Sequence, residues 1–268
     1  MNDKKLRLAL VGKDVSKSIS HKIHAFILRE WGFVCEYEAI SVPQTEFDSA
    51  MRRLIGDFDG FNVTIPYKRD VMGYLDEITG DAFDCGAVNT VVTSSMTGYN
   101  TDGVGFLLML RVAGVEVKGK KVLILGGGGS GRSSASALKK AGAEVFVYQR
   151  RREKLLELCG QLGVTPIDDP EVGGYDILVN CTGVGMHDTE GLSPVSKKAF
   201  EGVEYCVDLI YEPAESEFLR LAKSQGKKTL NGASMLFYQA YFADCLYIGR
   251  RSSDEEAKTL YQKFLQMK

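Results

Sequence analysis

A glycine-rich run at 126–132 has the composition and spacing of a phosphate-binding turn. Gly126, Gly128 and Gly131 fit the pattern G-x-G-x-x-G, directly after a short apolar run and before the helix-like stretch 133–141. In a strand–turn–helix setting, such glycines allow a tight turn, backbone approach to a diphosphate and close packing of helix on strand. The pattern alone is common in glycine-rich turns, but this setting indicates a dinucleotide site whose diphosphate lies at a helix N-terminus.

The next expected strand, residues 144–148, is followed by Gln149, Arg150, Arg151 and Arg152. In a dinucleotide-binding fold this strand end faces the adenosine ribose. An acidic residue there selects NAD, whereas basic residues accommodate the 2′-phosphate of NADP. Guanidinium groups bind phosphate in bidentate fashion. The simpler interpretation is that these arginines are solvated side chains at the start of a helix. Cations are unfavourable at a helix N-terminus, however, so their presence there needs a reason, and we favour NADP as the cofactor.

Polar segments in the first hundred residues follow expected strand ends, where an open α/β sheet places its ligand crevice. They are residues 18–20, 62–68, 86–90 and 98–102. Taken singly, each has a structural explanation. Ser20 and Asp102 are good helix N-cap residues, and Lys68 would ordinarily be a solvated surface side chain.

The periodicity of apolar residues predicts strands that alternate with helices. In the first hundred residues we expect strands at 6–12, 36–42, 58–65 and 87–93, helices at 21–31 and 47–55, a short helix ending at 75, and a turn at 97–98. A second series has strands at 122–125, 144–148, 176–181 and 205–209, with an edge strand at 228–230. Further helices are expected at 102–113, 233–248 and 254–266. The two series predict two α/β domains, each built mainly of parallel strands.

Length and composition restrict the class of protein. The chain has 268 residues, 44% of them hydrophobic and 25% charged, with a net charge of −2. Nothing in this balance favours nucleic acid or a membrane as a partner. No apolar run approaches the roughly 18 residues of a transmembrane helix, and charges in the first ten residues argue against a signal peptide. The six cysteines are scattered singly and the three histidines form no ligand cluster, so we expect a cytoplasmic protein with reduced thiols and no metal.

Together, the order and spacing of the polar segments resemble the shikimate dehydrogenase family over nearly the whole chain. The matching motifs are S-x-S at 18–20, N-V-T-x-P-x-K at 62–68, G-A-x-N-T at 86–90, G-x-N-T-D at 98–102, the glycine loop ending in Arg132, N-x-T-x-x-G-M at 180–186, D-x-x-Y-x-P at 208–213 and G-x-x-M-L-x-x-Q-A at 232–240. The chain departs from the family at His21, where proline is usual, at Ala25, where asparagine is common, and at 149–151, where N-R-[ST] is usual.

The resemblance implies reversible, NADP-dependent reduction of 3-dehydroshikimate to shikimate, with Lys68 and Asp102 as the catalytic pair. It implies substrate contacts from Ser18, Ser20, Thr64, Asn89, Tyr211 and Gln239. It implies cofactor contacts from Gly126, Gly128, Gly129, Ser130, Gly131, Arg132, Gln149, Arg150, Arg151, Thr182, Gly232 and Met235. No metal is required, because the nicotinamide carries the hydride.

The resemblance also implies how the domains divide. An N-terminal substrate-binding domain is expected at 1–103, completed by C-terminal helices at 233–268, and a Rossmann-type NADP-binding domain at 104–232. The expected partner is a small-molecule substrate, and the protein is expected to be a monomer or a homodimer.

Two alternatives stay open at this stage. One is a quinate or dual quinate/shikimate dehydrogenase of the same superfamily. The basic residues at 149–152 and both serines of S-x-S disfavour an NAD-linked quinate enzyme. The other is a non-catalytic NADP-binding protein on the same fold. Retention of Lys68 and Asp102 disfavours this second alternative, because a sensor need not keep a proton-transfer pair.

Overall fold

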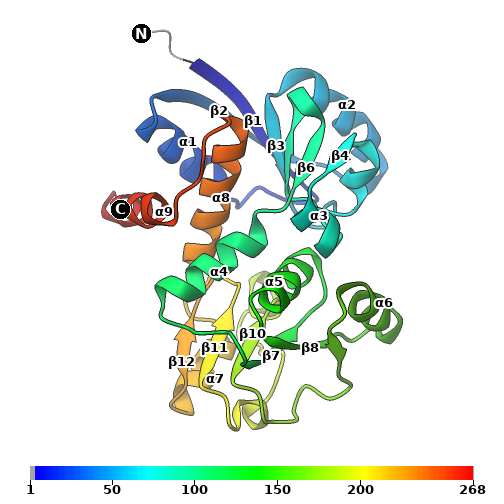
Figure 1. Ribbon diagram of the computed structural model, residues 1–268, viewed down its shortest axis with the longest axis vertical. Helices are drawn as coiled ribbons and strands as arrows, with labels where there is room; N and C mark the ends of the chain where they lie inside the picture. The colour runs from blue at the N-terminus through cyan, green and yellow to red at the C-terminus, as the bar shows by residue number, and fades with distance from the viewer. Residues whose placement is uncertain (1–3, 268) are drawn as a thin grey trace. The chain divides into compact units, whose positions relative to one another are not determined.

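The computed structural model describes residues 4–267 and divides into two compact units, which we call the first and second units (Figure 1). The first unit runs to Gly105 and resumes at Leu236, and the second is Phe106–Met235. Two helices, α4 (Asp102–Val112) and α8 (Ala233–Tyr247), contribute residues to both. Each unit is a sheet with helices packed on it, so the predicted α/β class is confirmed.

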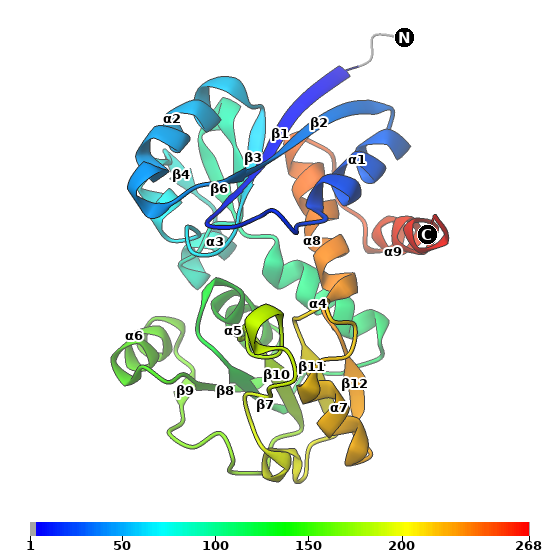
Figure 2. The ribbon, with the colours of Figure 1, turned by 180° about the vertical axis from the view of Figure 1, so that it is seen from behind.

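In the first unit the described residues form a six-stranded sheet in the order β2-β1-β3-β5-β6-β4. Its strands are β1 (Lys4–Gly12), β2 (Phe33–Ser41), β3 (Gly60–Val63), β4 (Glu77–Ile78), β5 (Thr90–Val92) and β6 (Thr97–Tyr99). Its helical segments are α1 (Ser20–Glu30), η1 (Gln44–Glu46), α2 (Phe47–Asp57), η2 (Asp70–Tyr74), α3 (Gly80–Cys85), η3 (Thr93–Ser95), most of α8, and α9 (Asp254–Gln266). Helices α8 and α9 lie beside α1 (Figures 1 and 2).

Helix α2 shows why the core of the first unit forms. Phe47, Met51 and Leu54 recur at helical spacing, so they share one face of the helix. That face packs into a buried cluster with Phe61 and Val63 of β3. The burial of these side chains anchors β3, and the polar segment that follows β3 therefore begins at a fixed point.

The described strands of this sheet are mainly parallel, as predicted, and the exception is β5, which is antiparallel to both β3 and β6. Some local predictions were wrong in this unit. The chain reverses at η3 and at Met96, whose φ of 45° is left-handed, and residues 97–98 therefore lie in a strand and not in a turn. Ser20 does not cap α1, because the helix begins at Ser20 itself and Ile19 occupies the cap position.

In the second unit the described strands are all parallel, in the order β12-β11-β10-β7-β8-β9. They are β7 (Lys121–Leu125), β8 (Glu144–Tyr148), β9 (Thr165–Pro166), β10 (Ile177–Asn180), β11 (Tyr205–Asp208) and β12 (Lys228–Leu230). The helical segments are α5 (Gly129–Lys140), α6 (Arg152–Leu162), η4 (His187–Thr189), η5 (Lys197–Phe200) and α7 (Glu217–Ser224). Helices α5 and α6 lie over one face of the sheet and α7 over the other (Figures 1 and 2).

The strand order of the second unit is that of the dinucleotide-binding fold, with β7 as its first strand. The order reverses between β7 and β10, and ligands of such sheets bind outside the carboxyl ends of the two strands at that point. The carboxyl end of β7 continues into the glycine run at 126–131. The fold therefore places the glycine run where a dinucleotide would bind.

The glycine run closes tightly on itself. A Cβ atom on Gly131 would lie 2.0 Å from the carbonyl oxygen of Gly126, and Gly126 itself has a φ of +101°. Helix α5 begins at Gly129, earlier than the 133 expected, because the glycines themselves form its first turn. A side chain on Gly128, by contrast, would meet no described atom within 4 Å.

We therefore predict that alanine destabilises the protein at one of these glycines and has little effect at the other. Gly131→Ala should lower the free energy of unfolding by about 1–3 kcal/mol, because the new methyl group overlaps a backbone oxygen that cannot move freely. Gly128→Ala, the matched control, should change it by less than about 1 kcal/mol. Urea denaturation of the two variants beside the parent protein measures both changes. Equal stabilities of the two variants would contradict this account of the turn.

Candidate active site

A buried ion pair lies at the centre of the first unit's polar segments. Lys68 Nζ is 2.5 Å from Asp102 Oδ2, and the two side chains are only 10% and 8% exposed. Lys68 lies in the turn after β3, where its carbonyl oxygen accepts a hydrogen bond from Val88 N. Asp102 is the first residue of α4, and its backbone N–H donates to Asn100 Oδ1. Both charged groups are thus held on fixed backbone.

Asn89 connects this ion pair to the sheet. Its Nδ2 donates to Asp102 Oδ1 at 2.8 Å and to Thr101 Oγ1 at 2.9 Å. Its Oδ1 accepts from Thr101 N and from Thr90 Oγ1, both at 2.9 Å. Asn89 is 3% exposed. The side chain therefore organises Asp102 in addition to any contact with a ligand.

Gln239 on α8 reaches the same group of residues. Its Oε1 accepts from Asn89 Nδ2 at 3.4 Å, and its Nε2 donates to Leu236 O at 2.9 Å. Gly105 on α4 permits this approach, because a Cβ there would lie 2.8 Å from Gln239 N. Thr64 is half-buried directly after β3, with its backbone N–H bonded to Val11 O at 2.9 Å.

The two serines of S-x-S lie together at the start of α1. Ser18 Oγ donates to Ser20 Oγ at 3.0 Å, and Ser20 N donates to Ser18 Oγ at 3.2 Å. His21 is exposed, and its Nδ1 lies 3.1 Å from the carbonyl oxygen of Ser18. The first turn of α1 contains no acidic residue. Paired hydroxyl groups at a helix N-terminus form a neutral site suited to a carboxylate.

The glycine turn of the second unit has the shape that a diphosphate requires. Gly128 is the N-cap residue of α5, so no side chain covers the first N–H groups of this helix. Gly126 lies against the segment that follows β10, where a Cβ would be 2.9 Å from Thr182 Cγ2. Thr182 is itself fixed, because its backbone N–H and its hydroxyl group both donate to Asn180 Oδ1. Gly129 and Ser130 continue the turn into α5.

The arginines after β8 have different surroundings. Arg152 forms an ion pair with Asp168. Arg150 and Arg151 are exposed, and in the part of the chain that the structure describes no carboxylate lies within ion-pair distance of either. Gln149 lies over the glycine turn, since a Cβ on Gly127 would meet its Oε1 at 2.1 Å. Two guanidinium groups are therefore available to an anionic ligand close to this turn.

Arg132 is buried and contacts α6. It is 4% exposed, its Nη1 donates to Gln161 Oε1 at 2.7 Å, and its Nη2 lies 3.7 Å from Glu157 Oε1. Both partners belong to α6. The observed contacts tie α5 to α6, which carries the neighbouring arginines.

The carboxyl end of β11 is held by Asp208, which is fully buried. Its oxygens accept from Asn180 Nδ2 at 3.1 Å, Ile210 N at 3.0 Å and Ser216 Oγ at 2.5 Å. Burial raises the pKa of Asp208, and the three hydrogen bonds oppose that rise. This network fixes the loop that carries Tyr211, which is half-buried; burial raises the pKa of the Tyr211 phenol as well.

Two further cofactor candidates lie where the second unit ends. A Cβ on Gly232 would be 2.1 Å from the carbonyl oxygen of Leu209, so only glycine lets β12 leave the sheet beside β11. Met235 is 7% exposed in the first turn of α8. Gly232 thus has a clear structural role, while the structure gives Met235 a buried position.

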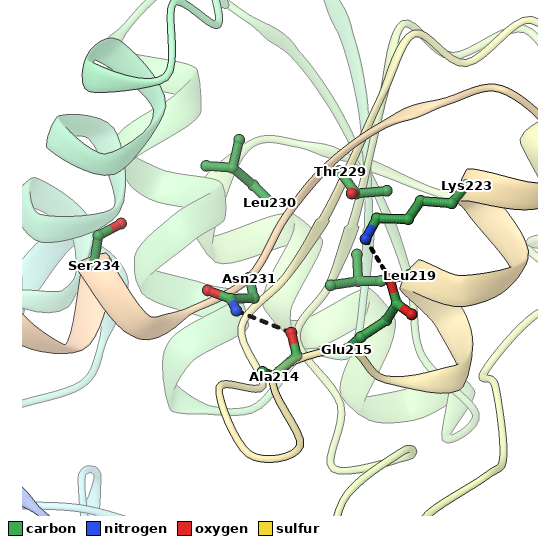
Figure 3. Close-up of a pocket in the computed structure, with 8 residues that line it drawn as sticks. All are labelled: Ala214, Glu215, Leu219, Lys223, Thr229, Leu230, Asn231 and Ser234. Carbon is green, nitrogen blue, oxygen red and sulfur yellow. Dashed lines mark hydrogen bonds and ion pairs between the residues drawn. The ribbon is translucent and has the colours of Figure 1, made fainter.

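A separate pocket of about 310 Å³ lies in the second unit between α7 and the residues around β12 (Figure 3). Lys223 in this pocket is paired with Glu215, and Asn231 Nδ2 donates to Ala214 O at 2.9 Å. None of the predicted site residues lines it. Because its charged side chains pair with each other and none of the predicted residues lies there, this pocket is not our candidate site.

One buried pair near the candidate site was not predicted. His24 Nδ1 lies 2.6 Å from Asp244 Oδ1, with side chains 1% and 0% exposed. The only sequence signal was a charged residue within the apolar stretch 235–248. Sequence spacing gives no indication that His24 and Asp244 meet, because they lie on α1 and α8 at opposite ends of the chain.

Residues 4–267 offer neither a metal centre nor a membrane-spanning helix. No group of three or more His, Cys, Asp and Glu side chains is arranged to hold a metal ion. No helix in that range is long and apolar enough to cross a bilayer.

The geometry defines a class of protein. The second unit is a dinucleotide-binding fold whose glycine turn exposes a helix N-terminus. The first unit carries a buried lysine–carboxylate pair surrounded by amides and hydroxyl groups. A nucleotide-binding unit joined to a unit with a proton-transfer pair is the arrangement of a nucleotide-dependent dehydrogenase.

Comparison with known proteins is more specific. Residues 10–91 match the model of the shikimate dehydrogenase substrate binding domain. The chain is 37% identical to the NADP(+) shikimate dehydrogenase of Thermus thermophilus, over 91% of this chain and 93% of the relative. It is 38% identical to that of Carboxydothermus hydrogenoformans, over 87% and 88% respectively.

Solved structures agree with these relatives. The Thermus thermophilus shikimate 5-dehydrogenase in complex with NADP(H) and shikimate superposes with a TM-score of 0.87, at 34% identity over 96% of this chain and 99% of that chain. The shikimate dehydrogenase 1 of Peptoclostridium difficile gives a TM-score of 0.89, at 31% identity over 97% of each chain. The chain belongs to the shikimate dehydrogenase family.

Proposed function

We propose that this protein catalyses the reversible, NADP-dependent reduction of 3-dehydroshikimate to shikimate. The observation that carries the proposal is the buried Lys68–Asp102 ion pair, held by Asn89 among hydroxyl and amide groups. The relatives named above are NADP(+) shikimate dehydrogenases, and one of them has been solved with NADP(H) and shikimate bound.

In the proposed mechanism Lys68 moves the proton. When bound, the nicotinamide supplies or accepts the hydride at the carbon that bears the reacting oxygen. As the carbonyl is reduced, negative charge develops on its oxygen, and the Lys68 ammonium stabilises that charge and donates a proton to it. In the oxidation direction the neutral amine accepts the hydroxyl proton. Asp102 aims the lysine through their 2.5 Å contact.

The other polar groups of the first unit would hold the substrate. We propose that Ser18 and Ser20 bind its carboxylate, since their hydroxyl groups lie 3.0 Å apart beside the N-terminus of α1. Thr64, Asn89 and Gln239 are assigned to the ring hydroxyl groups, which they can bind as donors or acceptors. The family resemblance adds Tyr211, which lies in the second unit.

We propose that the glycine turn of the second unit binds the NADP diphosphate. Its residues fit that role because Gly128 leaves the first N–H groups of α5 uncovered. Arg150 and Arg151 would bind the 2′-phosphate, and Gln149 lies beside the turn. Thr182, Gly232 and Met235 complete the proposed cofactor contacts. Arg132 would act by holding α6, through Gln161 and Glu157.

The proposal includes which ligand each unit binds and where in the cell the protein acts. The first unit would bind substrate and the second NADP. We further propose a cytoplasmic location, supported by six cysteines that are all free thiols. The proposed small-molecule partner is shikimate or 3-dehydroshikimate, and a monomer or homodimer would serve the chemistry equally.

The direct test is a spectrophotometric assay of NADPH formation with shikimate. NAD and quinate serve as the alternative cofactor and the alternative substrate in parallel reactions. We expect turnover with shikimate and NADP to exceed the other three combinations. Faster turnover of quinate would indicate a quinate enzyme, and tight NADP binding without any turnover would indicate a binding protein.

We predict that Lys68→Ala loses most of the turnover, about 10²–10⁴-fold, while keeping substrate affinity. The reason is that the proton carrier is removed but the serine site for the carboxylate remains. Because this variant leaves Asp102 buried without its cation, the double variant Lys68→Ala/Asp102→Ala serves as the control for folding. It should regain thermal stability without regaining turnover. Near-normal kcat in Lys68→Ala would refute the role of this lysine.

We predict that Arg150→Ala/Arg151→Ala raises the KM for NADP by about tenfold or more, and that for NAD by less than about twofold. The two guanidinium groups have no carboxylate partner among the described residues, whereas the 2′-phosphate is present only in NADP. Arg152→Ala is the matched control, because Arg152 is paired with Asp168, and it should change neither KM appreciably. Equal effects on both cofactors would exclude the assignment.

A further inference from the structure

The His24–Asp244 pair is more deeply buried than any charge the proposed chemistry needs. The imidazole and the carboxylate contact at 2.6 Å and are 1% and 0% exposed. Among residues 4–267, no hydrogen-bond partner is found for His24 Nε2 or for Asp244 Oδ2. Buried pairs with unsatisfied polar atoms are poor sources of stability, and apolar residues of similar volume often stabilise as well or better. The pair therefore needs an explanation other than stability.

The positions of His24 and Asp244 explain why the pair is present. His24 follows Ser20 by one turn of α1, and both side chains are buried, so they point to the same side of this helix. Asp244 lies on α8, the helix that carries Gln239. The hydrogen bond thus joins the helix of one proposed substrate ligand to the helix of another. It is directional, so it fixes how far α1 can slide along α8, whereas apolar contacts tolerate small shifts.

His24 is also connected to Asn89 of the candidate site through Tyr37 and Asn62. Its ring stacks on Tyr37, with centroids 4.6 Å apart and planes inclined by 15°. The Tyr37 hydroxyl donates to Asn62 Oδ1 at 3.0 Å, and Asn62 Nδ2 donates to Asn89 O at 3.3 Å. A continuous set of contacts therefore leads from Asp244 to the residue that holds the catalytic carboxylate.

We propose that His24 and Asp244 are positioning residues for substrate binding: their buried hydrogen bond sets the spacing between Ser20 and Gln239. The inference rests on the proposed function, because that proposal assigns Ser20 to the substrate carboxylate and Gln239 to its ring hydroxyl groups. Neither His24 nor Asp244 touches the substrate. They act through α1, α8 and the Tyr37–Asn62 contact, and polar ligands need placement to within about 0.5 Å.

The test is a variant series assayed with shikimate and NADP. Asp244→Leu removes the bond and should raise the KM for shikimate about tenfold or more, with kcat and the KM for NADP within about threefold of the parent protein. Asp244→Asn keeps an acceptor oxygen for His24 Nδ1 and should restore the KM to within about threefold. Tyr238→Phe, which removes another buried α8 polar atom without a partner, is the matched control and should leave the KM unchanged.

The double variant His24→Leu/Asp244→Leu separates positioning from stability. Thermal stability should return to the parent level or exceed it, because two buried polar side chains, each with one unsatisfied atom, are replaced by apolar packing. The KM for shikimate should nevertheless stay raised. Recovery of the KM together with the melting temperature would overturn the proposal, as would an unchanged KM in this variant. If Asp244→Leu does not fold, the double variant alone decides.

Turnover by the parent protein distinguishes the two proposals. If the parent forms NADPH from shikimate and the variants retain its KM, only the positioning role fails. If the parent shows no turnover, the proposed function fails, and the positioning role fails with it.

Discussion

The first unit depends on the burial of one positive charge. The Lys68 ammonium is removed from water, so it needs an anion at close range and that anion needs further donors. Asp102 supplies the anion at 2.5 Å, and Asn89 donates to its second oxygen. Asn89 in turn takes its orientation from the backbone of Thr101 and from Thr90. The polar segments 62–68, 86–90 and 98–102 converge because each contributes residues to this one buried, hydrogen-bonded group.

A different constraint governs the second unit, namely clearance between backbone atoms. Gly131 lies against the carbonyl oxygen of Gly126, and Gly232 against that of Leu209. Side chains at these positions would force the glycine turn or the end of β12 away from the sheet. Because they are absent, the first turn of α5 stays uncovered at the carboxyl edge of the sheet. An anion site there requires no charged side chain within the turn itself.

The two buried pairs of the first unit show how similar contacts serve different ends. Lys68–Asp102 belongs to the polar cluster assigned to chemistry, where a proton can be exchanged with a ligand. His24–Asp244 lies between helices, and in the described chain its outer atoms, His24 Nε2 and Asp244 Oδ2, meet no partner. The Lys68–Asp102 pair is hydrogen-bonded to other polar side chains of the candidate site, as expected of a reacting group. The His24–Asp244 pair joins α1 to α8, as expected of a structural contact between two helices. This difference is visible only in the contacts around each pair.

Much of the architecture could be predicted from local pattern. Alternating apolar runs gave both series of strands, and the parallel order around β7 follows from strand–helix alternation. Prediction was wrong where tertiary contacts override local preference. Residues 97–98, predicted as a turn, lie in β6 because the chain reverses earlier, at η3 and Met96, and Ser20, predicted as an N-cap residue, is the first residue of α1. The cofactor contact of Arg132 stays a prediction from its motif, and the structure adds a bond from its guanidinium group to Gln161 of α6.

The fold class, the family and the residues that could bind or react follow from the amino-acid sequence, because spacing and residue type are local properties that motifs preserve. Which of those residues touch one another depends on the folded chain. The 2.5 Å contact of Lys68 with Asp102 and the meeting of His24 with Asp244 depend on how distant segments pack. Side-chain partnership across a fold is set by burial and by the need to satisfy every buried polar group, and neither can be evaluated before the chain is folded.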